Sequence, residues 1–458
     1  MRAAERWARI AVCTTIVLMI CRGASAQSGG GDIAAETHVL TGAYNASALV
    51  LLKELSAAQG NIVLSPYSIG TAMAMVLSGA GGETEREMAG VLEQRLDRAA
   101  MAAADAAVRS VLDGYDKSAV APNCPAGLQP SGTNCETALP DDGKCVYPAE
   151  RDGDRCLAPG SFPPSARLLT ANALMLTKLG DSVTADYAAL LQHDYDAELF
   201  RNAGVDDVNG WVARKTEGKI DHILDRLDQA SAAVIVNAVY FKARWAEMFN
   251  KAATADNAFD LSSRQKISVP TMRRSGSYAL AARPGYRALR LPYQVSPLGM
   301  IIVLPNEIDG LDEVDRRLDA GEWAQLVSAL HTPDAGKLVD LELPRFKASF
   351  EANLAPLFQR AGMVRAFDPK RADFSGMTGR PPTELQFAIG SIVHRAVIDV
   401  MEDGTEAAAT TAVSIVAASA RSSSEKPQLF HVNRPFLFAI LDDVSGAILF
   451  QGRIIDPR

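Results

Sequence analysis

The pattern of apolar positions predicts a chain whose helices are concentrated early and whose strands are concentrated late. Apolar residues recur at helical spacing over residues 34–55, and a second helix is predicted to begin at Pro66 with Ser65 as its cap. Further helices are predicted over 101–115 and 183–193. Continuous apolar runs are typical of buried strands, and they occur at 168–176, 234–241, 300–304 and 447–455. Together these elements predict a fold of the α+β class.

This periodicity disappears between about residues 116 and 165, where Pro, Gly, Asp and Cys dominate. We interpret the segment as a surface insertion that is closed by two disulfides. Its cysteines follow the spacing C-x10-C-x9-C-x10-C and are Cys124, Cys135, Cys145 and Cys156. Three pairings are possible, and the spacing does not choose between them. A zinc site is the alternative, although the close cysteine pairs of zinc sites are missing.

A second unusual segment follows the strand-like run AVIDV and reads EDGTEAAATT over residues 402–411. Read with the period of a strand, its residues are small on both faces, and Glu406 is the only charge after the glycine. No proline occurs between Glu402 and Lys426. The segment therefore suits a solvated loop in one state and a central strand in another. A flexible Ala/Ser/Thr linker is the alternative interpretation.

Residues 402–411 resemble the reactive-loop hinge of the serpins, a family of serine protease inhibitors, and the resemblance continues along the chain. Eight further segments resemble serpin segments and follow in the order of the family. They are NIVLSPYSIGTAMAMVLSGAGGETEREM (61–88), NGWVARKTEGKI (209–220), VNAVYFKARWAEMF (236–249), LPYQVSPLGMIIVLPNEIDGL (291–311), LPRFKASFEANLAPLFQRAGM (343–363), ADFSGM (372–377), RPFLFAI (434–440) and GAILFQGRIIDP (446–457). No single segment is specific, but their number and order are.

The resemblance implies the serpin fold, with a large mixed β-sheet, further sheets and about eight to nine helices. It also implies that residues 27–458 form a single domain, with the insertion at about 116–165 and a mobile reactive loop at about 402–427. The fold class expected from the resemblance agrees with the α+β class expected from the apolar pattern.

The resemblance assigns three groups of functional residues. The hinge comprises Glu402, Gly404, Thr405, Glu406, Ala407, Ala408 and Ala409. A polar cluster beneath the point where the sheet opens comprises Ser65, Ser68, Asn237 and His394, with Trp245 at the top of the opening. Counting fourteen residues on from Gly404 places the reactive bond at Ala418-Ser419, with Arg421 as the competing bait residue.

These residues imply an inhibitor that a serine protease attacks as a substrate, so that an acyl-enzyme forms and the hinge inserts into the main sheet. An alanine at the bond suits an elastase-like protease with a small specificity pocket. Two alternatives remain open: a non-inhibitory carrier or chaperone, and an exported binding protein that uses the cysteine-containing insertion. Small residues in the hinge favour inhibition, whereas Met401, which replaces the usual asparagine, favours the carrier.

The charge and motif content exclude several other functions. The chain is mildly acidic, with a net charge of −8 and no basic block, which argues against nucleic acid as a partner. It contains none of the motifs GxSxG, HExxH, P-loop or GxGxxG in a suitable context, and its six histidines accompany no recognisable nucleophile motif. We therefore expect no enzyme, no cofactor and no metal site.

The first 26 residues are predicted to be an export signal. Arg2, Arg6 and Arg9 form a basic start, residues 10–20 are apolar, and Ala24-Ser25-Ala26 is a small-residue cleavage site. The apolar run is too short to cross a bilayer, so we expect no membrane anchor. A lipoprotein at Cys21 is the alternative, but the bulky Ile20 precedes it. We expect a secreted monomer, extracellular or periplasmic, whose partner is the target protease in a covalent complex.

Overall fold

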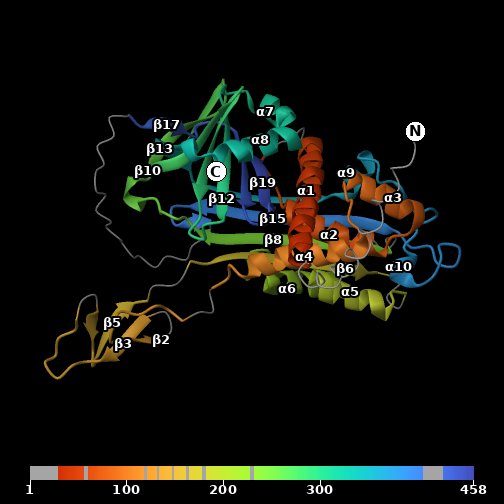
Figure 1. The fold of residues 1–458 in the computed structure, drawn as a ribbon, viewed down its shortest axis with the longest axis horizontal. Coiled ribbons are helices and arrows are strands. Elements are labelled where there is room, and N and C mark those ends of the chain that lie inside the picture. The colour runs from red at the N-terminus through yellow and green to blue at the C-terminus, as the bar shows by residue number, and fades with distance from the viewer. Residues whose placement is uncertain are drawn as a thin grey trace, which may run out of the picture.

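A computed structural model describes residues 29–55, 60–117, 121–131, 134–146, 149–160, 164–177, 182–226, 232–405 and 426–458. In these residues three β-sheets and ten α-helices form an α+β fold, as the sequence predicts (Figure 1). The helix number slightly exceeds expectation because short turns such as α10 (Ser375–Thr378) count as helices. No helix in the described part of the chain is long and apolar enough to span a membrane.

The main sheet has six strands and is mixed. Its order is β14 (Phe346–Asn353), β15 (Ile389–Met401), β16 (Gly404–Thr405), β8 (Ala233–Arg244), β6 (Ala166–Leu176) and β7 (Glu198–Arg201). The strands β15 and β8 pair directly and in parallel over most of their length, and β16 lies between them only at one end. The strand β8 is almost entirely buried, as its continuous apolar run predicts, whereas buried positions in β15 alternate with partly exposed ones over much of its length.

A second sheet of nine strands packs on the first. Most of its pairs are antiparallel, and its edge strand β17 pairs with β13 in parallel. Its order is β1 (Ile62–Leu64), β19 (Ile448–Ile454), β18 (Phe436–Asp442), β12 (Leu298–Pro305), β11 (Tyr286–Pro292), β10 (Gln265–Arg283), β13 (Gly336–Pro344) and β17 (Gln428–His431), with β9 (Ala255–Ser262) paired to β10. The two sheets contribute to one large hydrophobic core.

Helix α2 (Pro66–Gly79) lies at the centre of this core. All fourteen of its residues are buried, which requires an apolar helix without a polar face. The helix begins at Pro66, and its cap Ser65 accepts a hydrogen bond from the amide of Ser68, as predicted. Because α2 packs on both β8 and β19, its cap residues lie against the middle of the main sheet.

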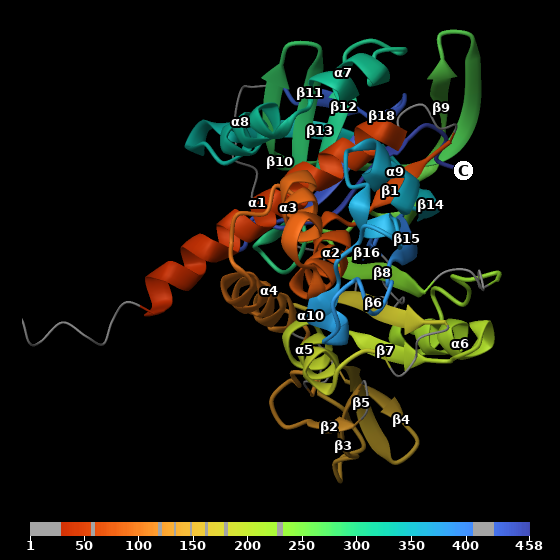
Figure 2. The ribbon, with the colours of Figure 1, turned by 90° about the vertical axis from the view of Figure 1, so that its right-hand side faces the viewer.

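The remaining helices cover the body around α2 (Figure 2). The predicted helices at 34–55, 101–115 and 183–193 are present, with ends that differ from prediction by at most five residues. The set is α1 (Gly29–Leu55), α3 (Gly82–Val91), α4 (Arg98–Asp113), α5 (Ala185–Tyr195), α6 (Val205–Lys215), α7 (Leu311–Arg317), α8 (Ala320–Leu330) and α9 (Ala355–Arg360).

The third sheet belongs to the cysteine-containing segment and projects from the body (Figure 1). Its four antiparallel strands are β2 (Gln129–Ser131), β3 (Asn134–Ala138), β5 (Arg155–Pro159) and β4 (Glu150–Asp152), in that spatial order. It has a small hydrophobic core of its own. We call residues 121–160 the insertion module.

Candidate functional site at the opening of the main sheet

The candidate site begins where Gly404 and Thr405 enter the main sheet. Thr405 pairs with Val400 on one side and with Ala243 on the other, so the two residues form the short strand β16. Gly404 has a φ of +152°, and a Cβ at this position would clash with the carbonyl oxygen of Ala243. Only glycine therefore fits this entry into the sheet.

Thr405 is fully buried and contacts Tyr293 at the opening. Its Oγ1 lies 2.7 Å from the hydroxyl of Tyr293, whose ring stacks on Trp245 at 4.5 Å between centroids. Burial raises the pKa of Tyr293 well above its ordinary value, so the phenol stays protonated. The side chain of Thr405 therefore lies in a closed, uncharged site formed by its hydroxyl contact with Tyr293 and by the stacked rings of Tyr293 and Trp245.

Trp245 also holds the turn that precedes β16. Its indole nitrogen donates to the carbonyl of Met401 at 2.9 Å, and its amide donates to the carbonyl of Asp403 at 3.1 Å. The amide of Phe249 donates to the carbonyl of Glu402 at 2.9 Å. Three backbone carbonyls in a row are thus bound by the chain that follows β8, which fixes the position of the turn.

The side chain of Glu402 is the buried charge of the site. One carboxylate oxygen accepts hydrogen bonds from Nε of Arg345 at 2.7 Å and from the hydroxyl of Thr254 at 2.5 Å. Burial raises the pKa of Glu402, but the hydrogen bonds from Arg345 and Thr254 outweigh burial, so the pKa lies below its ordinary value. The neighbouring Asp403 pairs with Lys251 at 2.7 Å. These ion pairs tie the hinge to the chain around it.

The predicted polar cluster lies farther along the strands, between β15 and β8. His394 and Asn237 are direct partners in this parallel pair, and Nδ1 of His394 lies 2.5 Å from Oδ1 of Asn237. The side-chain nitrogen of Asn237, Nδ2, lies 2.7 Å from Oγ of Ser68 and 2.5 Å from Oδ1 of Asn172. The chain of contacts therefore links the two strands to the start of α2.

His394 is neutral in this environment. Burial lowers the pKa of His394 to about 3, and its Nδ1 proton is donated to Asn237. Its Nε2 is buried without a hydrogen-bond partner among the described residues. The cluster is thus uncharged and cannot act as an acid or base near neutral pH; its contacts can hold the two strands together.

The structure brings most of the predicted residues into two linked groups and adds others. Glu402, Gly404, Thr405 and Trp245 form the entry, whereas Ser65, Ser68, Asn237 and His394 form the cluster. The predicted residues Glu406, Ala407, Ala408, Ala409, Ala418 and Ser419 lie outside the described residues. Sequence reasoning missed Arg345, Tyr293 and Asn172. The first two stand in the segments LPRFKAS and LPYQ, which the resemblance had already marked.

The four cysteines form two disulfides within the insertion module. Cys124 pairs with Cys135 and Cys145 pairs with Cys156, with Cα–Cα distances of 5.4 and 5.5 Å. The second cysteine of each pair is buried. This pairing leaves no thiolate for the zinc alternative, and no group of three metal-ligating side chains occurs in the part of the chain that the structure describes.

The module is an internal repeat that the sequence reasoning also missed. Equivalent cysteines are 21 residues apart (145 − 124 and 156 − 135), and each disulfide closes a hairpin. At the centre of the β3–β5 pair, Glu136 lies opposite Leu157, which is again 21 residues later. The two hairpins are therefore related by a local two-fold axis through this pair. The equal C-x10-C spacings were the available signal.

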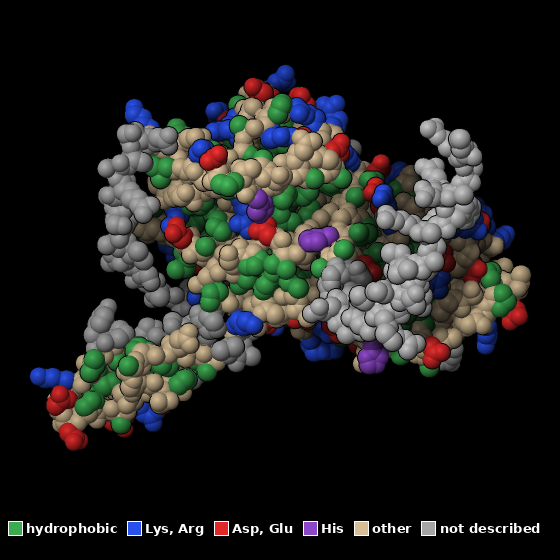
Figure 3. Space-filling model, viewed as in Figure 1, with side chains coloured by type: hydrophobic (Ala, Val, Ile, Leu, Met, Phe, Trp, Pro, Cys, Tyr) green, Lys and Arg blue, Asp and Glu red, His purple; other side chains and the backbone are tan. Residues whose placement is uncertain are grey.

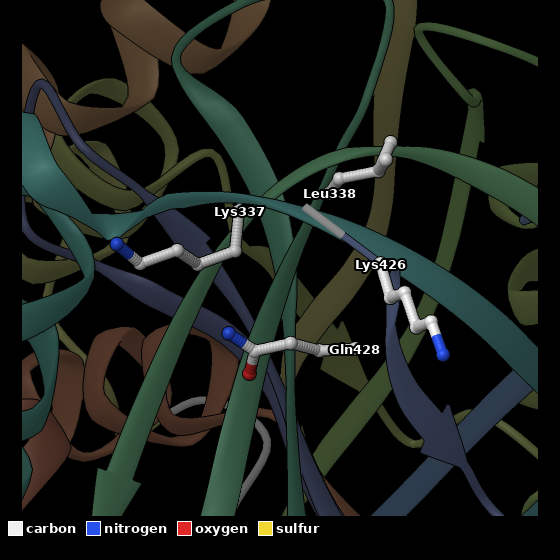
Figure 4. A pocket seen from close by; sticks show the side chains of 4 residues that line it. All are labelled: Lys337, Leu338, Lys426 and Gln428. Carbon is white, nitrogen blue, oxygen red and sulfur yellow. The ribbon is translucent and has the colours of Figure 1, made fainter. Parts of the chain in front are cut away.

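A shallow hollow of about 280 Å³ lies where the chain rejoins the body after the reactive-loop segment. It is lined by Lys337, Leu338, Lys426 and Gln428. The two lysine side chains point away from each other, and Leu338 points away from Gln428 (Figure 4). Ligand sites usually have polar groups that converge on one point, and this hollow does not.

Comparisons with known proteins agree with the fold. The sequence model described as "Serpin (serine protease inhibitor)" matches residues 42–133 and 154–457. An uncharacterized serpin-like protein of Thermococcus kodakarensis is 30% identical over 91% of this chain and 85% of its own length. The leukocyte elastase inhibitor of Equus caballus is 35% identical over 60% of this chain and 73% of its own length.

Solved structures share the fold at lower identity. Human thyroxine-binding globulin in complex with thyroxine superimposes with a TM-score of 0.71 at 21% identity, over 93% of this chain and 99% of its own. This likeness concerns the fold alone, and it shows that the fold also occurs in a protein that binds thyroxine. With the family match over both parts of the chain, the protein belongs to the serpin family.

Proposed function

We propose that the protein inhibits serine proteases by trapping them as acyl-enzymes, with Ala418-Ser419 as the reactive bond. The observation that carries this proposal is the position of Gly404 and Thr405 between β15 and β8. Beyond this point the two strands pair directly with each other. A strand that follows Thr405 into the sheet must therefore separate β15 from β8, and the hinge stands at the start of that path.

The chemical step belongs to the protease. Its serine oxygen attacks the carbonyl carbon of Ala418, the bond to the nitrogen of Ser419 breaks, and the released amine takes the proton that the serine gave up. The acyl group of the inhibitor is then an ester of the protease. Cleavage separates the hinge from the chain that begins at Ser419, so the residues between Thr405 and Ala418 become free to enter the sheet.

Insertion supplies the free energy for trapping. A strand of about fourteen residues spans roughly 45 Å, so the attached protease must move by a comparable distance. New ladder hydrogen bonds contribute about 1 kcal/mol each, and together with buried apolar surface they can exceed about ten kcal/mol. Misplacing catalytic groups by about 1 Å costs roughly a hundredfold in rate, so distortion of the protease slows hydrolysis of the ester.

In this proposal the two groups of the site have different roles. The entry residues Glu402, Gly404 and Thr405 seat the first part of the hinge, and small residues at Ala407, Ala408 and Ala409 allow the strand to continue inward. The cluster of Ser65, Ser68, Asn237 and His394 holds β15 against β8 until the strand enters. The side-chain hydrogen bond between His394 and Asn237 must break during insertion, together with the backbone pairing of β15 and β8.

The target we propose is an elastase-like protease. An alanine side chain fits a small specificity pocket, and the similar Equus caballus protein is named a leukocyte elastase inhibitor. The alternative function is that of a carrier, and the fold shared with thyroxine-binding globulin is compatible with it. The small hinge residues and the position of Thr405 at the start of the path between β15 and β8 favour the inhibitor, because a carrier needs no insertion.

The proposal includes the organisation of the whole chain. Residues 1–26 act as an export signal, and residues 27–458 form one serpin domain that is secreted and works as a monomer. The two disulfides support an oxidising compartment, because thiols stay reduced in the cytosol. The gap between the two parts matched by the family model, residues 134–153, falls within the insertion.

The test is covalent complex formation. Elastase-like and trypsin-like proteases are incubated with the protein, complexes that survive SDS and boiling are detected, and the released C-terminal fragment is sequenced. We expect an elastase-like complex and a fragment that starts at Ser419. A stable trypsin complex with a fragment that starts at Ser422 would overturn the assigned bond. Cleavage without any stable complex would overturn inhibition and favour the carrier.

A further inference from the structure

The stem of the insertion, where the chain leaves and rejoins the body, is held by hydrogen bonds. The amide of Ala166 donates to the carbonyl of Tyr115 at 3.1 Å, and the amide of Lys117 donates to Oγ of Ser165 at 3.2 Å. The hydroxyl of Tyr115 donates to Asp442 at 2.9 Å. The stem is therefore bonded to itself and to the body, and two disulfides with paired hairpins keep the module itself compact.

The stem stands beside the hinge. Ala243 in β8 pairs with Ala166, the first residue of β6, on one side and with Thr405 on the other. Neighbouring strands are about 4.8 Å apart, so Ala166 lies only about 10 Å from Thr405. The module thus leaves the body at the end of the main sheet from which the reactive-loop segment begins.

The surface of the module faces outward. The module projects from the body (Figure 3). Its outer strands β2 and β4 are exposed along their whole length, and its hydrophobic core is separate from the cores of the body. Val146 is 78% exposed, the most exposed large apolar side chain in the described residues. Over residues 121–160 six acidic residues stand against three basic ones, which makes the surface net acidic.

We propose that the insertion module is a second contact surface for the protease that attacks the reactive loop, and that it fits a protease with a basic rim around its active site. This inference rests on the proposed function. A protease domain of about 220 residues has a radius of gyration of about 17 Å. The proposed reactive bond lies thirteen residues beyond Thr405 (418 − 405). Because Thr405 is about 10 Å from the stem, a body of that size bound to the loop is brought to the end of the main sheet from which the insertion also leaves.

Such a surface changes the rate at which protease and inhibitor associate, and it does not change the later step in which insertion traps the protease. Complementary charge raises association rates by roughly 10- to 1000-fold at low salt. Insertion of the hinge proceeds between β15 and β8, and β8 separates this path from β6 and the stem. The module therefore increases the rate constant of complex formation and leaves the stoichiometry of inhibition unchanged.

Two variants test this surface. In the first, residues 118–164 are replaced by Gly-Gly, which retains Lys117 and Ser165 and the bonded stem. In the second, the module stays intact and three exposed carboxylates are neutralised: Asp141→Asn, Asp152→Asn and Asp154→Asn. The matched control neutralises three exposed carboxylates outside the module: Asp186→Asn, Glu313→Gln and Glu384→Gln. The second-order rate constant and the stoichiometry are measured for each protease at several salt concentrations.

With a protease of basic rim, we expect both module variants to form the complex at least about tenfold more slowly at low salt, with unchanged stoichiometry and a weaker salt dependence. The control should behave as the wild type. Equal rate constants for wild type and both variants, with every protease that forms a complex, would overturn the inference. A change in stoichiometry alone would also overturn it, because the module would then affect insertion.

The experiment separates this inference from the proposed function. If the wild type is cleaved without forming any complex, the inhibitory function fails, and the module is then judged by kcat/KM for cleavage of the loop. A tenfold fall in kcat/KM in the module variants still supports the contact surface. An unchanged kcat/KM contradicts it.

Discussion

Thr405 is the residue at which the hinge meets the closed sheet, and its burial makes a sharp prediction. Thr405→Arg places a charge beside the neutral hydroxyl of Tyr293, and burying an unpaired charge is costly. We expect the variant to be cleaved as a substrate, with the stoichiometry of inhibition raised at least about tenfold. The control Thr405→Ser keeps the hydroxyl and should inhibit normally. Wild-type stoichiometry in the Thr405→Arg variant would exclude Thr405 from the inserting hinge.

Asp105 in α4 predicts a dependence of stability on pH. It is fully buried, accepts hydrogen bonds from Tyr44 and Thr71 on one oxygen, and has no partner for the other among the described residues. Burial raises the pKa of Asp105 from 3.8 to about 6, despite the hydrogen bonds from Thr71 and Tyr44. Since the folded protein binds this proton more tightly, its stability falls as the pH rises from about 4 to about 6, and the cost is complete above pH 6.

Asp105→Asn removes this cost. A shift of about two pKa units corresponds to about 3 kcal/mol, so the variant should unfold several degrees above the wild type at pH 7.5. The difference should shrink as the pH falls toward 4.5. Thermal unfolding of both proteins across this range measures it, with the exposed Asp186→Asn as control. A difference that is constant over pH would show that Asp105 does not titrate with the shifted pKa.

At the residue scale, the sequence predicted which residues form the candidate site better than it predicted which residues contact each other there. Resemblance identified His394, Asn237 and Trp245, but not that Arg345 would bind Glu402. That contact joins residues 57 positions apart in the chain, and periodicity carries no information about such pairs. Likewise, the equal cysteine spacings left the disulfide pairing open, because it depends on how the two hairpins fold.

At the scale of elements, the pair β15–β8 should respond to the loss of the polar cluster. Asn237→Ala removes the hydrogen bonds to Ser68 and His394 and leaves their polar atoms buried and unpaired, at a cost of about 1–3 kcal/mol. We expect the intact protein to unfold a few degrees lower and to lose inhibitory activity faster on warming.

The control for this prediction is Asn257→Ala in β9, where the amide contacts Glu342 and Arg273 at the partly exposed edge of the second sheet. It should change the unfolding temperature little, because such contacts remain solvated. Equal losses in Asn237→Ala and Asn257→Ala would mean that the cluster does not hold the two strands together.

Elements with long apolar runs were predictable, and short or irregular ones were not. The strands at 168–176 and 234–241 and the cap at Ser65 are present with small shifts, because burial and capping are local signals. The four strands of the insertion module were not predicted. Their order depends on disulfides and on a hydrophobic core of a few residues, which leave little periodic pattern in the sequence.

At the scale of the whole molecule, the fold class was predictable because the family resemblance spans most of the chain. The position of the module relative to the hinge was not, because it depends on the register of β6 and β16 against β8. The architecture of the body could therefore be predicted from the sequence, whereas the placement of the insertion module beside the hinge follows from the assembled sheet.

We propose that the intact protein stores free energy that insertion of the hinge releases. Thermal unfolding of the intact protein and of the protein cleaved at the reactive loop measures this stored free energy. If an inserted strand adds about ten kcal/mol, at about 2 °C per kcal/mol for a large domain, the midpoint should rise by roughly 20 °C on cleavage. Equal midpoints for the intact and cleaved forms would contradict the account.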